Sequence, residues 1–341
     1  MLLIRKKAYA RAGLMGNPSD GYHGRTVSVI VGNFHAEVTL YEWDRVELVL
    51  SQEDQSCFRS IDELARDVRL HGYYGGIRLV KATIKKFAEY CRRQGHKLHS
   101  RNFSVRYQSD IPRQVGLAGS SAIIVATLRC LIEFYDVEIP LEVQPSLVLS
   151  VEIEELGIAA GLQDRVIQVY EGLVFMDFSR DRMRRLCGLE CGVYESINPE
   201  LLPPLYVAYC TDVSEPTEVV HGNLRARFEQ GEPAVVGAMA RFADLASRAR
   251  EVLLAGDADR LGELINANFD LRRSICPIPA DQIRMVEVAR SAGATAKFAG
   301  SGGAIIGTYP NETTFGCLQT ELGAIGCRVI RPVVKSSRLQ A

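Results

Sequence analysis

A glycine- and serine-bearing loop joins a strand-like segment to a long apolar segment in the first half of the chain. The loop covers residues 112–121, follows the strand-like residues 103–109 and precedes the largely apolar residues 122–135. An apolar run of that length predicts a buried helix. The glycines at 116 and 119 let backbone N–H groups turn toward a ligand, and the helix offers its positive end to an anion. The chain therefore needs a fold in which a sheet delivers this loop to the start of a buried helix.

Two interpretations of this loop remain open from the segment alone. One is a phosphate cradle to which Ser120 and Ser121 add hydroxyl groups, and the other is a serine-capped helix after a tight loop. The loop lacks the lysine of a P-loop. Neither serine stands in Gly-x-Ser-x-Gly, which argues against a hydrolase nucleophile.

The pattern of the remaining chain predicts an α+β protein with two domains. Residues 26–40 are rich in β-branched side chains and read as strand, and residues 75–94 carry apolar positions at helical spacing. Residues 179–199 read as loop, and the two prolines at 203 and 204 end that stretch, which places a domain boundary near 195–204. The second half is predicted as strand 205–211, helices 231–254, 257–274 and 280–292, strands 294–299 and 303–308, helix 312–325 and strand 327–333.

Charge and cysteine content exclude several classes of protein. Forty basic against 41 acidic residues leave a net charge of −1, and the basic clusters are scattered, which indicates no nucleic-acid partner and no membrane partner. No apolar run approaches the 18 or so residues that span a bilayer. The nine cysteines are odd in number and widely spaced, and no apolar leader opens the chain. We therefore expect reduced thiols and a cytoplasmic location.

A second glycine- and serine-bearing loop lies near the end of the chain. Residues 297–304 read Lys-Phe-Ala-Gly-Ser-Gly-Gly-Ala, with small residues between two predicted strands. Such a loop can form a tight hairpin, or it can pack against another backbone or the phosphates of a ligand. It is not Gly-x-Gly-x-x-Gly, so a dinucleotide site is unsupported.

An isolated aspartate and an acidic helix form a third feature. Asp164 lies among small and apolar residues at the predicted start of a helix, where the helix dipole favours its ionised form. A simple N-cap is the alternative interpretation. Glu152 and Glu154 would ordinarily be solvated, and only a metal would justify the burial of one of them.

The fourth feature is a long polar and glycine-rich stretch at residues 9–24. Its centre, Asn-Pro-Ser-Asp-Gly at 17–21, is a turn by its own chemistry. Carboxylate, amide and imidazole groups on one rigid turn also suit the hydroxyl groups of a sugar.

Taken together and in this order, the four features resemble the GHMP kinases, over residues 8–333. Residues 112–122 resemble the ATP-phosphate motif of that family, residues 11–20 its galactokinase-type first motif and residues 300–303 its third motif. Five segments are more similar still to the glucuronokinase subfamily. They are 16–20, 111–114, 119–123, 160–166 and 268–273.

The resemblance implies a two-domain α+β fold with the site in the cleft between the domains. An N-terminal ribosomal-protein-S5-like domain would cover 1–198 and hold ATP, and a C-terminal ferredoxin-like domain would cover 199–341. It implies transfer of the γ-phosphoryl group of ATP to the anomeric hydroxyl of a sugar acid, with Mg²⁺. A monomer or a homodimer is compatible with it.

The resemblance also assigns roles to residues. Asp164 would take or orient the proton of the attacking hydroxyl, and Arg11 would hold that carboxylate ionised and offset charge on the transferred group. Ser120 and Glu152 would be the Mg²⁺ ligands. The ATP-binding residues would be Pro112, Gly116, Leu117, Ala118, Gly119, Ser120, Ser121, Ala122, Gly300, Ser301 and Gly302. The sugar-binding residues would be Asn17, Asp20, Tyr22, His23 and Arg272.

Three departures from the family pattern bear on the substrate. Tyr9-Ala10 replaces the usual Pro-Gly, Asn17-Pro18 stands where galactokinases have Glu-His, and Ala299 stands where the third motif has a hydroxyl residue. The second departure argues against galactose. The cation for a sugar carboxylate stays open among Arg25, Arg113 and Arg272. A kinase for a heptose phosphate, fucose or galacturonate and a sensor that binds ATP and sugar without turnover are the alternatives.

Overall fold

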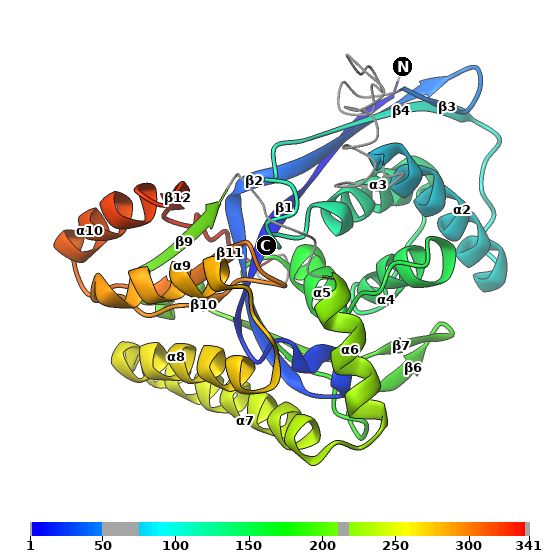
Figure 1. Ribbon diagram of the computed structural model, residues 1–341. Helices are drawn as coiled ribbons and strands as arrows, with labels where there is room; N and C mark the ends of the chain where they lie inside the picture. Colours follow the sequence, from blue (N-terminus) through cyan, green and yellow to red (C-terminus); the bar gives the residue numbers. More distant parts are fainter. Residues whose placement is uncertain (1, 50–74, 211–217, 338–341) are drawn as a thin grey trace, which may run out of the picture.

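The computed structural model describes residues 2–49, 75–210 and 218–337. Two larger β-sheets, a short two-stranded sheet and a set of helices form the described parts of the chain, and the long first two strands belong to the largest sheet (Figure 1). In the first part of the chain the elements are β1 (Leu3–Met15), η1 (Ser19–Tyr22), β2 (Arg25–Trp43), β3 (Glu47–Leu48), α2 (Gly76–Gln94), β4 (Asn102–Ser109), α3 (Gly119–Tyr135), α4 (Gln144–Ser150), η3 (Val151–Glu155), α5 (Leu162–Tyr170), β5 (Leu173–Asp177), β6 (Arg184–Leu186), β7 (Leu189–Cys191), β8 (Val193–Ile197) and η4 (Pro199–Leu201). They are followed by β9 (Leu205–Cys210), α6 (Glu218–Glu229), α7 (Pro233–Ala255), α8 (Ala258–Ile275), α9 (Ala280–Ser291), β10 (Lys297–Phe298), β11 (Ala304–Thr308), α10 (Glu312–Gly323) and β12 (Cys327–Ile330).

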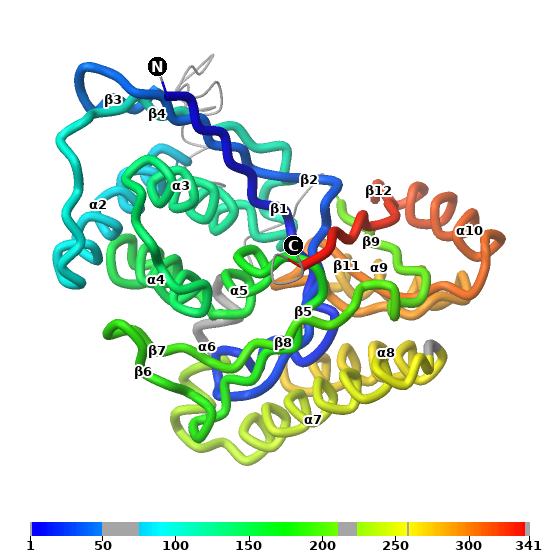
Figure 2. Tube along the Cα trace, turned by 180° about the vertical axis from the view of Figure 1, so that it is seen from behind, coloured from blue at the N-terminus to red at the C-terminus, as the bar shows by residue number. Residues whose placement is uncertain are grey.

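The larger sheet has the order β3-β4-β2-β5-β8, and β1 pairs with β2 beside that path. Helices α3 and α5 pack on β1 and β2, and α2 and α4 lie outside them (Figures 1 and 2). Helix α3 is buried along nearly its whole length, as its apolar sequence predicts. The predicted strand, loop and buried helix are therefore confirmed as β4, residues 110–118 and α3.

Strand β1 is the main element that sequence reasoning missed. The interpretation of residues 9–24 as one polar stretch is wrong for its first seven residues, because β1 continues to Met15 and residues 10–15 are buried. This segment contains alanine, glycine and arginine, which have low strand propensity, and packing against α3 overrides that propensity. Only residues 16–24 form the expected turn.

Two irregularities of the β1–β2 pairing flank Arg11. The register shifts between Tyr9 and Ala10, where β2 has three extra residues, 32–34, and shifts again between Gly13 and Met15. Such bulges re-aim side chains near functional sites. The chain near its C-terminus binds the first bulge, because Gly32 N–H donates to the carbonyl of Val333 at 2.8 Å.

The second sheet is antiparallel with the order β10-β11-β9-β12. Helices α9 and α10 cover it, with a separate apolar cluster between them. Helices α7 and α8 lie against each other, and α7 also packs on β2 of the larger sheet (Figure 1). The α+β class and the predicted elements of the second half are confirmed, with strand ends shifted by a few residues.

The region 179–199 corrects another expectation. It was predicted as loop, yet it contains β6, β7 and β8, and β8 is the edge strand next to β5. The division at 198/199 falls between β8 of the larger sheet and β9 of the second sheet. Past the second sheet, the hydroxyl of Ser337 forms a hydrogen bond of 2.8 Å with the hydroxyl of Ser196 on β8. The domain boundary stays a prediction.

The cysteines and the helices give two further findings. Cys210 and Cys327 are partners on β9 and β12 and form a disulfide, which contradicts the expectation that all cysteines are free thiols. A pairing between adjacent strands is not visible in spacing along the chain, because 117 residues separate the two cysteines. In the described part of the chain, no helix is long and apolar enough to cross a membrane.

Candidate active site

Arg11, which lies in the fourth sequence feature, contacts the other three. Its guanidinium on β1 binds both carboxylate oxygens of Asp164, with Nε–Oδ1 at 2.6 Å and the second nitrogen at 2.8 Å from Oδ2. The remaining nitrogen donates to the carbonyl of Gly116 and, at 3.1 Å, to that of Ala299. Since Arg11 is 5% exposed, these contacts fix the relative positions of helix α5 and both glycine-bearing loops.

Asp164 lies in the first turn of α5 and is not its N-cap. The N-cap position belongs to Gly161, so the N-cap interpretation of Asp164 is wrong. The Asp164 side chain retains 22% exposure and lies 3.4 Å from Arg165 as well. A carboxylate that two arginines hold, and that stays open to solvent on one side, can accept a hydrogen bond from a substrate hydroxyl.

Glu152 is completely buried in the π-helical turn η3 and has two partners. Its Oε2 accepts from Arg165 Nε at 2.6 Å, and its Oε1 accepts from the Ser120 hydroxyl at 3.1 Å. The expectation that only a metal would justify this burial is wrong, because Arg165 supplies the compensating charge. Burial alone would lower the pKa of Arg165, but the charges of Glu152 and Asp164 raise it.

The oxygens of Ser120 and Glu152 nevertheless fit a Mg²⁺ ion. Adjacent ligands of an octahedron with Mg–O distances of about 2.1 Å lie about 3 Å apart. The Ser120 Oγ and Glu152 Oε1 atoms are 3.1 Å apart, and Arg165 occupies the other oxygen of Glu152. Within the ranges that the structure describes, no three His, Cys, Asp or Glu side chains converge on one point, so an ion here would depend on water and ligand oxygens for its other positions.

Asp20 approaches Asp164 from the turn η1. Its Oδ2 accepts from the Gln163 N–H at 3.4 Å, and a Cβ on Gly161 would come within 2.0 Å of that oxygen. Only glycine therefore permits this approach of the turn to α5. Burial, and then the charge of Asp164, raise the pKa of Asp20 to about 6.

Three of the other residues predicted to bind sugar, Asn17, Tyr22 and His23, lie on the same turn, with different surroundings. Asn17 is buried, and its side-chain oxygen accepts from Lys297 Nζ at 2.6 Å. Tyr22 packs edge-on against Phe228 of α6 at 4.8 Å between ring centroids. His23 is exposed, and burial followed by the charges of Arg180 and Arg225 lowers its pKa.

The two glycine-bearing loops pack backbone to backbone. A Cβ on Gly300 would meet the carbonyl oxygen of Gly116 at 2.3 Å, and one on Gly116 would meet that of Gly302 at 2.7 Å. Gly116 also has a φ of +70°, which favours glycine. The loop at 297–304 thus forms a turn between β10 and β11 and also packs against another backbone, so both interpretations of its sequence apply.

The remaining predicted ATP residues line the start of α3. Ala118 has a left-handed conformation, and its carbonyl accepts from the Ala122 N–H at 3.3 Å, the Ser121 hydroxyl at 3.3 Å and Gln168 Nε2 at 2.8 Å. Leu117 is buried, and its carbonyl accepts from the Arg11 N–H at 3.2 Å. Pro112 and Ser301 are partly buried, and Ser120 is exposed. The exposed hydroxyl therefore lies at the positive end of a buried helix.

Arg272 has contacts other than those expected of a sugar ligand. It is 5% exposed and donates to the carbonyls of Gly300 and Ser301 at 2.9 Å each. Arg25 of the same candidate set pairs with Asp177 at 3.0 Å. Both arginines are engaged elsewhere in this structure.

Sequence reasoning missed three polar residues of this region. Lys297 is 1% exposed, Arg165 holds Glu152, and Asn268 of α8 accepts from the Gly16 N–H at 2.7 Å. A signal existed for Lys297, a cation among apolar and small residues, and Arg165 and Asn268 stand in the subfamily-like segments 160–166 and 268–273. Those segments did not indicate the role of Asn268, which depends on a turn 252 residues away.

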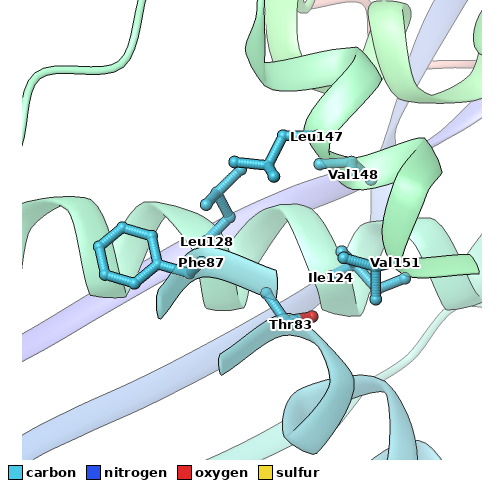
Figure 3. Close-up of a pocket in the computed structure, with 7 residues that line it drawn as sticks. All are labelled: Thr83, Phe87, Ile124, Leu128, Leu147, Val148 and Val151. Atoms are coloured by element: carbon cyan, nitrogen blue, oxygen red, sulfur yellow. The ribbon is translucent and has the colours of Figure 1, made fainter. Parts of the chain in front are cut away.

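A crevice between α2, α3 and α4 is unsuited to polar ligands. It is too narrow to hold a water molecule and is lined by Thr83, Phe87, Ile124, Leu128, Leu147, Val148 and Val151 (Figure 3). The hydroxyl of Thr83 already donates to the carbonyl of Leu79 at 2.6 Å. This crevice lacks the groups that would bind a phosphate or a sugar hydroxyl, so the site around Arg11 remains the candidate.

Comparisons with known proteins identify relatives of this chain. Residues 78–172 match the family model described as GHMP kinases N terminal domain. Glucuronokinase 1 of Arabidopsis thaliana is 45% identical over 89% of this chain and 84% of its own length, and probable glucuronokinase 2 is 44% identical over 97% and 91%. The structure of Lactococcus lactis galactokinase complexed with galactose has a TM-score of 0.78 at 15% identity and covers 98% of this chain and 94% of its own.

Proposed function

The chain belongs to the GHMP kinase family, and on that premise we propose that it transfers the γ-phosphoryl group of ATP to the anomeric hydroxyl of D-glucuronate. The products are glucuronate 1-phosphate and ADP. The observation that carries the proposal is the Arg11–Asp164 pair, which lies between the two glycine-bearing loops in a chain about 45% identical to a glucuronokinase.

Asp164 is the proposed catalytic carboxylate. Its solvent-facing side accepts the proton of the anomeric hydroxyl or orients that hydroxyl toward the γ-phosphorus. Arg11 holds the carboxylate and adds positive charge where negative charge develops on the transferred group. Phosphoryl transfer depends on positioning and charge neutralisation more than on covalent chemistry, so a firmly paired carboxylate is adequate.

The ATP phosphates are proposed to lie between the two loops. The first-turn N–H groups of α3 face them from one side, and the loop 300–302 faces them from the other. Ser120 and Glu152 Oε1 are the residues that would hold Mg²⁺, and a bound ion would offset negative charge on the phosphates. Pro112 and residues 117–122 shape this cradle.

The sugar is proposed to bind over the turn η1. Asp20 accepts hydrogen bonds from ring hydroxyls, and Tyr22 and His23 border the same turn. The cation for the sugar carboxylate is proposed to be Arg225 of α6, because it contacts the turn that carries Asp20. Arg225 donates to the carbonyl of Gly21 at 3.0 Å and lies 5.3 Å from the Tyr22 ring centroid, with a weaker contact to Glu229 at 3.7 Å.

The test is ADP release with ATP and Mg²⁺ on a panel of sugars. The panel contains glucuronate, galacturonate, glucose, galactose, fucose and a heptose phosphate. We expect turnover on glucuronate that is lost in Asp164→Asn and kept in Asp270→Asn, a matched aspartate that pairs with Arg290 at 2.8 Å on the outside of α8. Preference for another sugar would replace the substrate, and ATP binding without turnover on any sugar would favour a sensor.

A further inference from the structure

Lys297 is a buried cation whose partners are all neutral. Its Nζ donates to the carbonyl of Gly13 at 2.6 Å, to Asn17 Oδ1 at 2.6 Å and to its neighbour's carbonyl, Phe298 O, at 2.7 Å. Among the residues that the structure describes, no carboxylate pairs with it. A lysine that is 1% exposed ordinarily needs such a pair, so this one requires an explanation beyond packing.

The three contacts require the charged form of the lysine. Each acceptor is a carbonyl-type oxygen, and only an ammonium group has three N–H donors for three acceptors. Burial, and then the charges of Arg272 and Arg11, lower the pKa of Lys297 well below its usual range. Loss of the proton would leave one of these buried oxygens without its donor.

Lys297, Arg11 and Arg272 bind backbone carbonyls of the loop at 297–304. Four successive carbonyls, those of residues 298, 299, 300 and 301, accept hydrogen bonds from Lys297, Arg11 and, twice, Arg272. In a trans peptide unit the N–H of the next residue points away from the carbonyl. The N–H groups of residues 300–302 therefore point away from the cations, and in the described parts of the chain they have no acceptor.

The Lys297 ammonium group also binds β1 and the turn that follows β1. Gly13 lies two residues after Arg11 on β1, and Asn17 lies in the turn that carries Asp20. Lys297 stands on β10, which leads into the loop assigned to the phosphates, and its nitrogen atom binds β1 and the turn assigned to the sugar. A shift of either partner changes the hydrogen bonds available to the other.

We propose that Lys297 is a positioning residue that couples the sugar-binding turn to the phosphate-facing loop, so that each substrate strengthens the binding of the other. The inference rests on the proposed function for the assignment of these two segments. It concerns a residue that touches neither the sugar nor ATP.

The experiment measures glucuronate affinity by calorimetry, with and without a saturating non-hydrolysable ATP analogue and Mg²⁺. In the wild type we expect the analogue to tighten glucuronate binding by about 5- to 50-fold. In Lys297→Met this factor falls toward one, and Lys297→Arg retains part of it. Lys335→Met is the matched control, because Lys335 also contacts β1, through the Tyr9 hydroxyl and ring, but lies away from the loop.

A pH series on the wild type tests the inference without any variant. Coupling should fall as the pH rises through the lowered pKa of Lys297, and Lys297→Arg should keep its coupling there because arginine stays charged. Unfolding would not explain this loss. The unfolded lysine binds its proton more tightly than the folded one, so the Lys297 contribution to stability rises with pH over the same window.

The outcomes separate this inference from the proposed function. Absence of glucuronate binding to the wild type contradicts the proposed function. Glucuronate binding with the full coupling factor in Lys297→Met overturns the role of Lys297 alone. If Lys297→Met does not fold, a coupling factor in the wild type that is independent of pH overturns it instead.

Discussion

Asp164 and Asp20 lie at the same end of α5 and have opposite surroundings. Asp164 is held by both nitrogens of an Arg11 fork at 2.6 and 2.8 Å. Within the described residues, Asp20 has no such fork: the Gln163 N–H donates to it at 3.4 Å, and it faces the charge of Asp164. The first carboxylate is therefore held in a fixed position by a cation, whereas the second is ionised at some cost to the folded state.

The difference separates two tasks that one carboxylate performs poorly. A group that orients a nucleophile needs a fixed position, and Arg11 and α5 provide it. A group that recognises hydroxyls gains most when its folded state lacks good partners, because the ligand then supplies them. The site thus combines a rigid side near Asp164 with a strained side near Asp20.

Removal of Arg11 should have the largest effect on kcat, because Arg11 fixes the position of Asp164. Arg11→Met removes both short hydrogen bonds to Asp164 and leaves the contact with Arg165 at 3.4 Å, so we expect kcat to fall by about 10²- to 10³-fold. Arg165→Met is the matched control, since both arginine side chains are 6% exposed and each binds a carboxylate. Because Glu152 is fully buried and Asp164 is not, Arg165→Met should lose more unfolding free energy, about 3–5 kcal/mol in urea titrations. Equal stability losses in the two variants would contradict the comparison.

Neutralisation of Asp20 tests whether its charge destabilises the folded state. The folded-state pKa is raised from 3.8 to about 6, so the folded state binds this proton more tightly than the unfolded state. The resulting stability is present below the unfolded pKa and is lost as the pH rises through about 6. Asp20→Asn does not titrate there, so it should be more stable than the wild type by about 2–3 kcal/mol at pH 8. Its advantage should vanish near pH 4, and urea titrations at both pH values measure it.

The substitution Arg225→Met tests whether the region around Asp20 also recognises the negative charge of the substrate. Arg225→Met removes a charged partner of the sugar carboxylate, which is worth about 1.5–3 kcal/mol, so the KM for glucuronate should rise by about 10- to 100-fold. Turnover on glucose, if measurable, should not change. Arg227→Met on the same helix is the control, because that side chain pairs with Glu232 and faces the Ile275 carbonyl. An equal rise in KM for both sugars would mean that Arg225 only supports the turn.

Glu154 gives the smallest effect and shows what exposure does to an ion pair. It lies on the same π-helical turn as Glu152 and pairs with Lys86 at 2.7 Å, but its side chain is 59% exposed. Glu154→Gln should change the free energy of unfolding by less than about 1 kcal/mol and leave kcat unaltered. A larger loss would indicate that charge on this turn, rather than burial, governs its stability.

The chain's local patterns predicted much of the fold, and long-range contacts account for the rest. Helices α2 and α3 and strand β2 have strong periodicity or apolar runs, and their interpretation is confirmed. Strand β1 lacks that signal because its residues 10–15 are buried on both faces and contain alanine, glycine and arginine. The disulfide and the bulge at residues 32–34 depend on partners far along the chain, which no local pattern reports.

The candidate site shows the same division. The motifs located Arg11, Asp164, Ser120 and Glu152, and the structure brings all four together. The roles of Lys297 and Arg165 were not predicted, because the fold alone shows that the first binds Gly13 and Asn17 and the second binds Glu152. The role given to Arg272 followed a subfamily segment, whereas the structure shows it on the loop carbonyls.

The most direct test of the two-carboxylate division compares kcat and KM for glucuronate in Asp164→Asn and Asp20→Asn at saturating ATP and Mg²⁺. Asp164→Asn should lower kcat by at least about 10²-fold with a nearly unchanged KM, since it alters the group that orients the reacting hydroxyl. Asp20→Asn should raise KM by about 10-fold or more and change kcat far less, since it weakens recognition of the sugar. A preserved kcat in Asp164→Asn, or a loss confined to kcat in Asp20→Asn, would contradict the division of roles.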